Sequence, residues 1–268
     1  MSQVENHYDS GPELEWERLE RHRTEFALTT LTLHEYLPPP PTYILDIGGG
    51  PGRYSIALTQ QGYTVTLLDL SRGNLTFARS KAQEAGVQLA GYIHGNALSL
   101  SQFAEESYDA VLLLGPLYHL LEVEEREKAI KEAARVLKTG GCIFAAFITR
   151  SAPLRFWAKN EPTAIIKYSG LFEEYLTKGT YRAISGSDAG FTDAYFAHHT
   201  EIKPLMERCG LQTLDLVACE GIISMIDNKL NELTGEAWEA WVNLNYSWSK
   251  DPAVHGTTEH LLYVGRKP

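Results

Sequence analysis

Hydrophobic and polar positions follow two different periods along this chain. Short apolar runs alternate with longer segments in which apolar residues recur every three to four positions. The apolar runs are typical of strands buried on both faces of a parallel sheet, and the second period is typical of helices. The pattern therefore predicts an α/β protein. The predicted strands are 43–47, 63–70, 89–94, 108–114, 142–148, 211–218 and 260–266, and the predicted helices are 53–61, 72–85, 122–137 and 200–209.

Three segments stand outside this alternation. Residues 1–41 carry one or two predicted helices and end in four prolines at 38–41, which force an extended linker because proline lacks the N–H that a helix needs. Residues 150–199 show no dominant period but are rich in aromatics. We divide the chain into an N-terminal helical lid (1–41), a core (42–149), an aromatic-rich substrate lid insertion (150–199) and the rest of the core (200–268). The alternative for the insertion is a small helical subdomain whose aromatics form its own core, and we expect this to account for most of them. A helical insertion at about 224–250 carries tryptophans with the spacing of a buried helix face.

A glycine-rich turn follows the first predicted strand, in the order Asp46-Ile47-Gly48-Gly49-Gly50-Pro51-Gly52. Glycine lets the backbone turn tightly and approach a ligand that a Cβ would push away. Such a turn binds a nucleotide-like ligand. The carboxylate of Asp46 would repel a phosphate but suits a cation, so the turn favours a sulfonium compound that carries an amine.

The D-x-G-x-G-x-G pattern of this turn resembles the first motif of the class I S-adenosylmethionine (SAM) dependent methyltransferases, small-molecule type. Further matches follow in order at Asp69, at Gly95-Asn96-Ala97 and at the junction 134–144, so that the resemblance spans 43–149. It implies a Rossmann-like seven-stranded sheet, mostly parallel with a C-terminal antiparallel hairpin, helices on both faces and helical lid insertions. It also implies SAM as cofactor, S-adenosyl-L-homocysteine as product, and 42–149 as the SAM-binding core.

Asp69 ends the second predicted strand, which in a sheet wound this way lies beside the first turn, so its carboxylate can accept both ribose hydroxyls. The alternative role, capping the next helix, suits Ser71 better. The family commonly has Gly-Asp-Ala at 95–97; Asn96 keeps a carbonyl acceptor for the adenine amine, and Ala97 supplies an N–H. The other predicted cofactor-binding residues of the core are Asp46, Gly48, Gly49, Gly50, Gly52, Leu70, Leu114, Gly115 and His119.

The loop after the fourth strand, Gly115 to His119, falls at the edge of the sheet where ligands of open α/β folds bind. The resembling family places this loop against the transferred methyl group. His119 and Tyr118 are the first candidates for catalysis, because histidine can act as a base near neutral pH; anchoring the loop or contacting the cofactor is the alternative role of His119. His199, at the end of the aromatic insertion, is a third catalytic candidate.

The N-terminal helices offer two further cofactor contacts. Tyr8 and Arg21 are placed to close over the cofactor, as N-terminal helices often do in similar proteins. The alternative for this segment is a structural brace, with Trp16, Phe26 and Leu28 buried against the sheet, and we favour it for those three residues.

Charge and composition narrow the class of partner. The chain has 268 residues and a formal net charge of −10, which argues against a nucleic-acid surface and favours a small-molecule substrate. The three cysteines are scattered in apolar surroundings, so we expect reduced core residues and no metal site. We expect no membrane association, a cytoplasmic location and a possible homodimer.

The functional hypothesis is an enzyme, a methyltransferase that transfers the SAM methyl group to an oxygen or nitrogen atom of a small molecule. Two alternatives stay open. One is an enzyme that uses SAM without methyl transfer, by attack at another sulfonium carbon or by cyclisation of SAM itself. The other is a non-catalytic SAM-binding module. An RNA or protein methyltransferase is disfavoured by the acidity and by the absence of an Asn-Pro-Pro-aromatic signature after the fourth strand.

Overall fold

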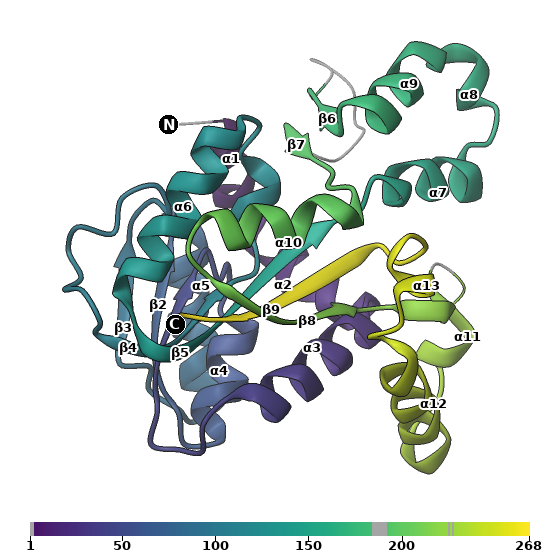
Figure 1. Ribbon diagram of the computed structural model, residues 1–268. Helices are drawn as coiled ribbons and strands as arrows, with labels where there is room; N and C mark the ends of the chain where they lie inside the picture. The colour runs from purple at the N-terminus through teal and green to yellow at the C-terminus, as the bar shows by residue number, and fades with distance from the viewer. Residues whose placement is uncertain (1–2, 184–191, 225, 227) are drawn as a thin grey trace.

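A single seven-stranded sheet organises the molecule, in the order β3-β2-β1-β4-β5-β9-β8 (Figure 1). The computed structural model describes residues 3–183, 192–224, 226 and 228–268. The pairs among β1 to β5 are parallel, whereas β9 runs antiparallel to both β5 and β8. The strands of this sheet are β1 (Tyr43–Ile47), β2 (Thr64–Asp69), β3 (Gly91–His94), β4 (Tyr108–Leu113), β5 (Leu137–Ile148), β8 (Gln212–Ala218) and β9 (His260–Arg266).

Helices cover both faces of the sheet and extend beyond its edges. The N-terminal and core helices are α1 (Gln3–Asp9), α2 (Pro12–Arg21), α3 (Arg23–Tyr36), α4 (Arg53–Gln60), α5 (Arg72–Glu84), η1 (Pro116–His119) and α6 (Val123–Val136). The later helices are α7 (Ser151–Asn160), α8 (Ala164–Lys167), α9 (Ser169–Thr177), α10 (His199–Arg208), η2 (Gly221–Ile223), α11 (Asn228–Asn231), α12 (Gly235–Trp248) and α13 (Pro252–His255). In the described residues no helix combines the length and the apolar character needed to cross a membrane.

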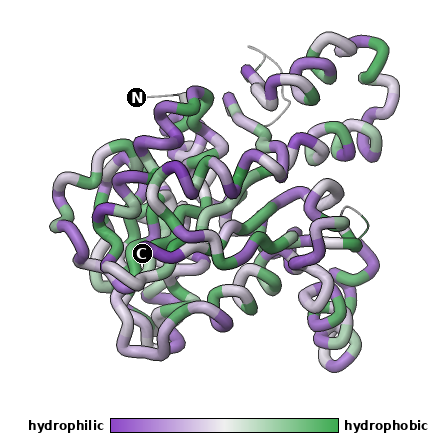
Figure 2. Tube along the Cα trace, viewed as in Figure 1, coloured by the Kyte–Doolittle hydropathy of each residue, from purple (hydrophilic) through white to green (hydrophobic). Residues whose placement is uncertain are grey.

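The two faces of the sheet carry separate cores because successive strand residues point to opposite faces. Leu45 and Ile47 of β1 pack with residues of α6 and α10 on one face, whereas Ile44 packs with residues of α3 and α4 on the other. Figure 2 shows hydrophobic residues concentrated along these central strands. All three side chains are fully buried, which explains why the strand reads as an uninterrupted apolar run.

The predicted fold class is confirmed, including the mostly parallel sheet and the C-terminal antiparallel hairpin of β8 and β9. One predicted junction is wrong in detail. The basic and glycine residues at 138–141 resemble a helix stop, but α6 already ends at Val136 and β5 begins at Leu137, which pairs with Tyr108 of β4. The pairing with β4 holds this stretch extended instead.

The N-terminal segment forms three helices instead of the one or two predicted, since α1 precedes α2 and α3. Leu28 of α3 is fully buried, whereas Trp16 and Phe26 are only partly buried. α12 packs against α3, and Tyr246 and Lys250 at its C-terminal end contact Glu35. The prediction that the α12 tryptophans form a core is wrong for two of them.

Those two, Trp241 and Trp248, are 41% and 54% exposed, because α12 contacts the rest of the protein along its other side, where Val242 and Asn245 are buried. Helical spacing alone did not tell which face of the helix is covered.

The aromatic insertion folds as a small unit of its own, with α7, α8, α9 and the two-stranded sheet β6 (Thr180–Tyr181) and β7 (Ala194–Tyr195). In Figure 1 its helices stand away from the main sheet, at the upper right. Its aromatics pack mainly on one another, with Tyr175 at the centre between Phe172, Tyr181 and Phe196. Residues 184–191 of the predicted lid lie outside the described residues. The division of the chain into a core and two lids stays a prediction.

Candidate functional site

A cavity of about 330 Å³ opens at the carboxyl ends of β1, β2 and β4. The glycine turn forms its floor, the loops after β2, β3 and β4 form its sides, and residues of α1 and α2 cover it. Among the predicted site residues, those that line it are Tyr8, Asp46, Gly48, Gly49, Gly50, Asp69, Leu70, Asn96, Ala97, Leu114, Gly115, Tyr118 and His119. Their roles in binding and catalysis stay predictions.

The turn requires glycine for conformation at some positions and for space at others. Gly48 and Gly50 have φ values of 67° and 56°, a left-handed backbone that residues with a Cβ rarely adopt. A Cβ at Gly49 would lie 2.5 Å from Leu67 Cδ1 and would also overlap the Asp46 carboxylate. Gly52 does not line the cavity, contrary to its predicted role; it has a φ of 83° and precedes α4, packed towards Ala78.

Asp69 is buried beside the turn and is held in one orientation. Its Oδ2 accepts from the Gly50 N–H at 2.8 Å, and its Oδ1 accepts from the Ser71 N–H at 2.8 Å. Burial raises the pKa of Asp69, while these hydrogen bonds act in the opposite direction by stabilising the carboxylate. Ser71 caps α5 through its hydroxyl, as the sequence predicts, which leaves Asp69 free of that role. A carboxylate fixed at the cavity wall can accept ligand hydroxyls.

Asp46 contributes a buried polar atom that lacks a hydrogen-bond partner among the described residues. Its Oδ2 accepts from the Ser55 hydroxyl at 2.7 Å, whereas Oδ1 is buried and unsatisfied. Burial, reinforced by the neighbouring Asp69, raises the pKa of Asp46 to about 7 even though the Ser55 hydrogen bond lowers it. A cationic group in the cavity would favour the charged carboxylate, so the site fits an amine-bearing ligand.

Asn96 lines the cavity, but its side-chain oxygen already accepts a hydrogen bond within the turn that follows β3. Asn96 Oδ1 accepts from the Leu98 N–H at 2.9 Å. A carbonyl oxygen has a second lone pair, so this bond still permits the predicted contact with an adenine amine.

His119 lies between two hydroxyl groups at the end of η1. Its Nε2 is 2.9 Å from Tyr8 Oη, and its Nδ1 is 2.9 Å from Thr192 Oγ1. Burial lowers the pKa of His119 to about 4, so the imidazole is neutral at neutral pH. The Tyr118 ring packs beside it with centroids 4.7 Å apart, and burial raises the pKa of the Tyr118 hydroxyl. Neutral imidazole offers one ring nitrogen as an acceptor.

Two predicted site residues are placed elsewhere, and these predictions are corrected. The Arg21 side chain is 57% exposed and pairs with Glu17, since it lies on the outer side of α2 at its last turn. His199 begins α10, where its ring packs on His198 with centroids 4.4 Å apart, and it does not line the cavity.

Sequence reasoning missed two arginines that line the cavity, Arg18 and Arg53. Arg18 lines it together with Glu15, whose carboxylate accepts from Arg18 Nε at 2.8 Å. A signal was present, because Arg18 immediately precedes Leu19, the buried residue of α2. Thr192, which contacts His119 from within the aromatic insertion, carries no comparable signal in the sequence.

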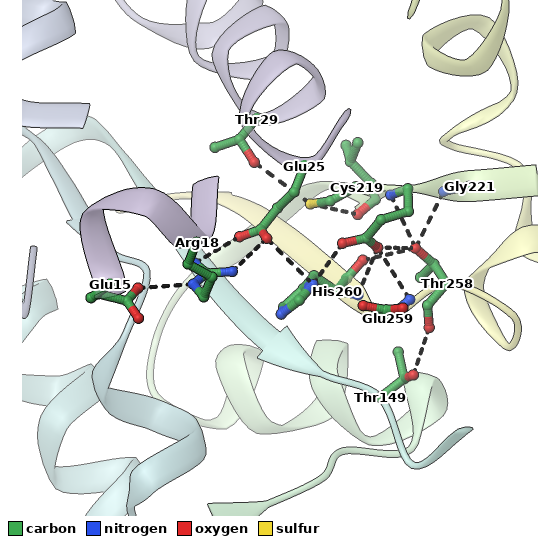
Figure 3. A network of polar contacts seen from close by, with 12 residues as sticks. Glu15, Arg18, Glu25, Thr29, Thr149, Cys219, Gly221, Thr258, Glu259 and His260 are labelled. Atoms are coloured by element: carbon green, nitrogen blue, oxygen red, sulfur yellow. Dashed lines mark hydrogen bonds and ion pairs between the residues drawn. The ribbon is translucent and has the colours of Figure 1, made fainter. Parts of the chain in front are cut away.

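Arg18 also begins a polar network that continues to the buried side chains of Glu25 and Glu220 (Figure 3). Its guanidinium donates to Glu25 Oε2 at 2.6 Å and to Oε1 at 3.2 Å. Glu25 in turn lies 3.8 Å from His260 Nδ1, which is 2.6 Å from Glu220 Oε1. The possible ligand atoms of Glu25, Glu220 and His260 lie within 4.8 Å of one another, so a metal ion is geometrically possible there.

Comparison with known proteins agrees with this geometry. Residues 45–145 match the methyltransferase domain family. A ubiquinone biosynthesis O-methyltransferase of Paracidovorax citrulli is 32% identical over 109 residues, which are 41% of this chain and 44% of that protein. The chain thus matches less than half the length of this curated relative.

Two solved structures share the fold over most of the chain. A SAM-dependent methyltransferase of Methanosarcina mazei superposes with a TM-score of 0.61 at 22% identity, covering 88% of this chain and 96% of that one. The [4+2]-cyclase SpnF superposes with a TM-score of 0.56 at 17% identity, covering 90% of this chain and 80% of that one. At these identities the likeness shows the fold alone.

The chain therefore contains a methyltransferase domain of the class I SAM-dependent type over 45–145. SAM is the cofactor of domains of this class, and the predicted resemblance is confirmed.

Proposed function

We propose that this protein is a SAM-dependent enzyme that methylates an oxygen or nitrogen atom of a small molecule. The observation that carries the proposal is the pairing of the glycine turn with two buried carboxylates, Asp46 and Asp69, at one end of the cavity. The cavity suits a ligand with vicinal hydroxyls and a cationic amine. The methyltransferase domain match over 45–145 supports the same reading.

Each part of the cofactor has a proposed partner in the cavity. Asp69 accepts the ribose hydroxyls, and the unsatisfied Oδ1 of Asp46 faces the amino group. Asn96 and Ala97 flank the adenine. Arg18 lines the same cavity with a side chain that is 28% exposed, and we assign it to the amino-acid carboxylate. When bound, SAM supplies a methyl group already activated as an electrophile by the sulfonium.

His119 is the proposed proton acceptor for an oxygen nucleophile. In the tautomer with the proton on Nδ1, the Nδ1–H donates to Thr192 Oγ1 and Nε2 accepts from Tyr8 Oη. The acceptor hydroxyl takes the place of Tyr8 Oη at Nε2 when it transfers its proton there. An oxygen acceptor loses its proton during attack, whereas a neutral amine can attack first. A neutral imidazole in the cavity therefore favours oxygen, as does the similarity to a protein named an O-methyltransferase.

A second candidate is SAM-dependent chemistry without methyl transfer. The fold is shared with a [4+2]-cyclase, so architecture alone does not fix the reaction. A non-catalytic SAM-binding module is the third. The three differ in their products, because only the methyltransferase yields S-adenosylhomocysteine together with a methylated acceptor.

The test is to incubate the protein with SAM and a small-metabolite extract and to analyse the mixture by mass spectrometry. The proposal predicts one acceptor heavier by a methyl group and an equal amount of S-adenosylhomocysteine. Consumption of SAM without a methylated acceptor would establish the second candidate. Binding of SAM with neither product in any extract fraction would establish the third.

A further inference from the structure

The polar network that begins at Arg18 joins three parts of the chain that are far apart in sequence. Arg18 comes from α2, Glu25 from α3, Glu220 from the residues between β8 and η2, and His260 from the first position of β9. Glu25 and Glu220 are 7% and 2% exposed, and the His260 side chain is 15% exposed. Two carboxylates so close together and so buried repel one another unless cations lie between them.

His260 supplies one of these cations. Burial alone would lower its pKa, but Glu25 and Glu220 outweigh burial and raise it to about 9. Burial alone would raise the pKa of Glu25, but Arg18 and His260 lower it to about 2. The charged and titratable groups that face His260 are Glu25 on α3, Glu220 after β8, Arg18 on α2 and His22 between α2 and α3. With His260 protonated, the set of Arg18, Glu25, Glu220 and His260 is neutral.

A metal ion is the competing explanation, and the hydrogen bonds argue against it. Both oxygens of Glu25 already accept from Arg18, and Glu220 Oε1 is bound by His260 Nδ1. The other oxygen of Glu220 accepts from the Thr258 hydroxyl and from the N–H groups of Glu259 and His260. A metal would have to displace Arg18 and the His260 proton from a network that is already satisfied.

We propose that His260 is a positioning residue for Arg18: by fixing the Glu25 carboxylate, it holds the Arg18 guanidinium at the cavity wall to bind the amino-acid carboxylate of the cofactor. The bonds to Glu15 and Glu25 engage three of the five guanidinium N–H groups, which leaves two for a ligand. This inference rests on the proposed function, because it assigns a role within SAM binding.

Charge balance explains why a distant histidine matters. While His260 neutralises one buried carboxylate, the charge of Arg18 is shared among Glu25, Glu15 and the ligand. Without that proton the same cluster carries a net negative charge beside the cavity, and it repels the ligand carboxylate. His260 thus acts on a ligand that it does not touch.

The test compares two ligands that differ in the amino-acid part. S-adenosylhomocysteine has the carboxylate, whereas 5′-methylthioadenosine keeps the adenosine and the sulfur but lacks it. Both are titrated calorimetrically into the wild type, His260→Gln, Arg18→Gln and the double variant. His34→Gln is the matched control, since His34 lies exposed on α3, the same helix as Glu25.

We expect His260→Gln and Arg18→Gln each to weaken the affinity for S-adenosylhomocysteine by about tenfold. The affinity for methylthioadenosine should change by less than about twofold. The double variant should be no weaker than Arg18→Gln alone, since both substitutions act through one contact. If His260→Gln does not fold, Glu25→Gln takes its place with the same expectation. The proposal would be overturned if the variants lost equal affinity for the two ligands, if they lost none, or if the losses of the two single variants added up in the double variant. It would also be overturned if the wild type contained a stoichiometric metal ion that His260→Gln lacks.

The same titrations distinguish a failure of the proposed function from a failure of the positioning role. A wild type that binds neither ligand refutes the cofactor assignment, whereas a wild type that binds both and is indifferent to His260→Gln refutes only the positioning role.

Discussion

Single residues in this cavity owe their properties to burial more than to neighbouring charges. Burial raises the pKa of Asp46 to about 7 and lowers that of His119 to about 4, so both side chains move toward their neutral forms. In His119 this has a direct consequence. A ring that stays neutral at pH 7 is able to accept a proton, although its low pKa makes it a weak base.

Substituting His119 separates a proton acceptor from a cofactor contact. We expect His119→Gln to lower kcat by about 10²-fold or more, in the range of general-base catalysis, and to leave the affinity for S-adenosylhomocysteine within about threefold. Because the pKa of His119 lies near 4, kcat in the wild type should show no histidine ionisation between pH 6 and 8. Tyr8→Phe, which removes only the hydroxyl facing Nε2, is the control. A variant that loses affinity and keeps kcat would make His119 a cofactor contact.

Among single residues, the sequence predicted those whose residue type and whose place at a strand end both indicate the same role. Asp69 could be predicted because the end of the second strand must lie beside the glycine turn in this winding order. Arg21 was predicted as a cofactor contact and Arg18 was missed, because the sequence shows the charge of a side chain but not its direction. The pairing of Glu25 with Glu220 and His260 joins residues that are about two hundred positions apart, and one sequence holds no signal for it.

At the scale of elements, the turn between β1 and α4 shows two distinct reasons for glycine. Gly49 lacks room for a Cβ, which would overlap Asp46 and lie 2.5 Å from Leu67 Cδ1. Gly50 has a φ of 56° but open space, because the nearest atom to a Cβ there would be 3.8 Å away. The first constraint is steric and the second is conformational.

These constraints predict unequal costs for the same substitution. Gly49→Ala should lower the free energy of unfolding by about 3 kcal/mol through overpacking. Gly50→Ala should lower it by about 1 kcal/mol through the left-handed backbone. Urea denaturation of both variants measures the difference. If both variants lost the same free energy of unfolding, or if Gly50→Ala lost more, the turn would have relaxed around the new Cβ, and the close contacts at Gly49 would not constrain the turn.

Regular elements were easier to predict than their boundaries and their packing. All seven strands of the main sheet were found, because buried strands leave continuous apolar runs. The start of β5 and the exposed tryptophans of α12 were missed, since strand pairing and the choice of helix face depend on tertiary neighbours. The aromatic insertion gave no period, and its short helices are stabilised by a core of their own.

At the scale of the whole molecule, the buried charge network ties the N-terminal helices to the edge hairpin. Arg18 and Glu25 belong to the N-terminal helices α2 and α3, whereas Glu220 follows β8 and His260 begins β9. The energy of this network therefore enters both global stability and the placement of α2 and α3, so it should be visible in the pH dependence of unfolding.

The pKa of His260 is raised in the folded state, from an ordinary value near 6.5 to about 9. Its stabilising contribution is therefore complete below about pH 6.5 and is lost as the pH rises through about 9. The pKa of Glu25 is lowered to about 2, so its contribution is complete above about pH 4.5 and is lost at lower pH.

We expect the Tm of His260→Gln to lie about 5 °C below that of the wild type at pH 6, and the difference to shrink towards pH 9. Differential scanning calorimetry at several pH values measures this. A difference that is constant with pH would mean that the histidine contributes by packing and not by charge.

The central claim is that the cavity beside the glycine turn binds SAM through Asp69. It is tested most directly by calorimetric titration of S-adenosylhomocysteine into the wild type, Asp69→Ala and the control Asp109→Ala. Asp109 also lies on a strand of the sheet, but it pairs with Lys138 and does not line the cavity. We predict binding to the wild type and to Asp109→Ala, and a loss of at least about 100-fold in Asp69→Ala, which remains folded by circular dichroism. Near-normal affinity in Asp69→Ala, or no binding to the wild type, would contradict the account.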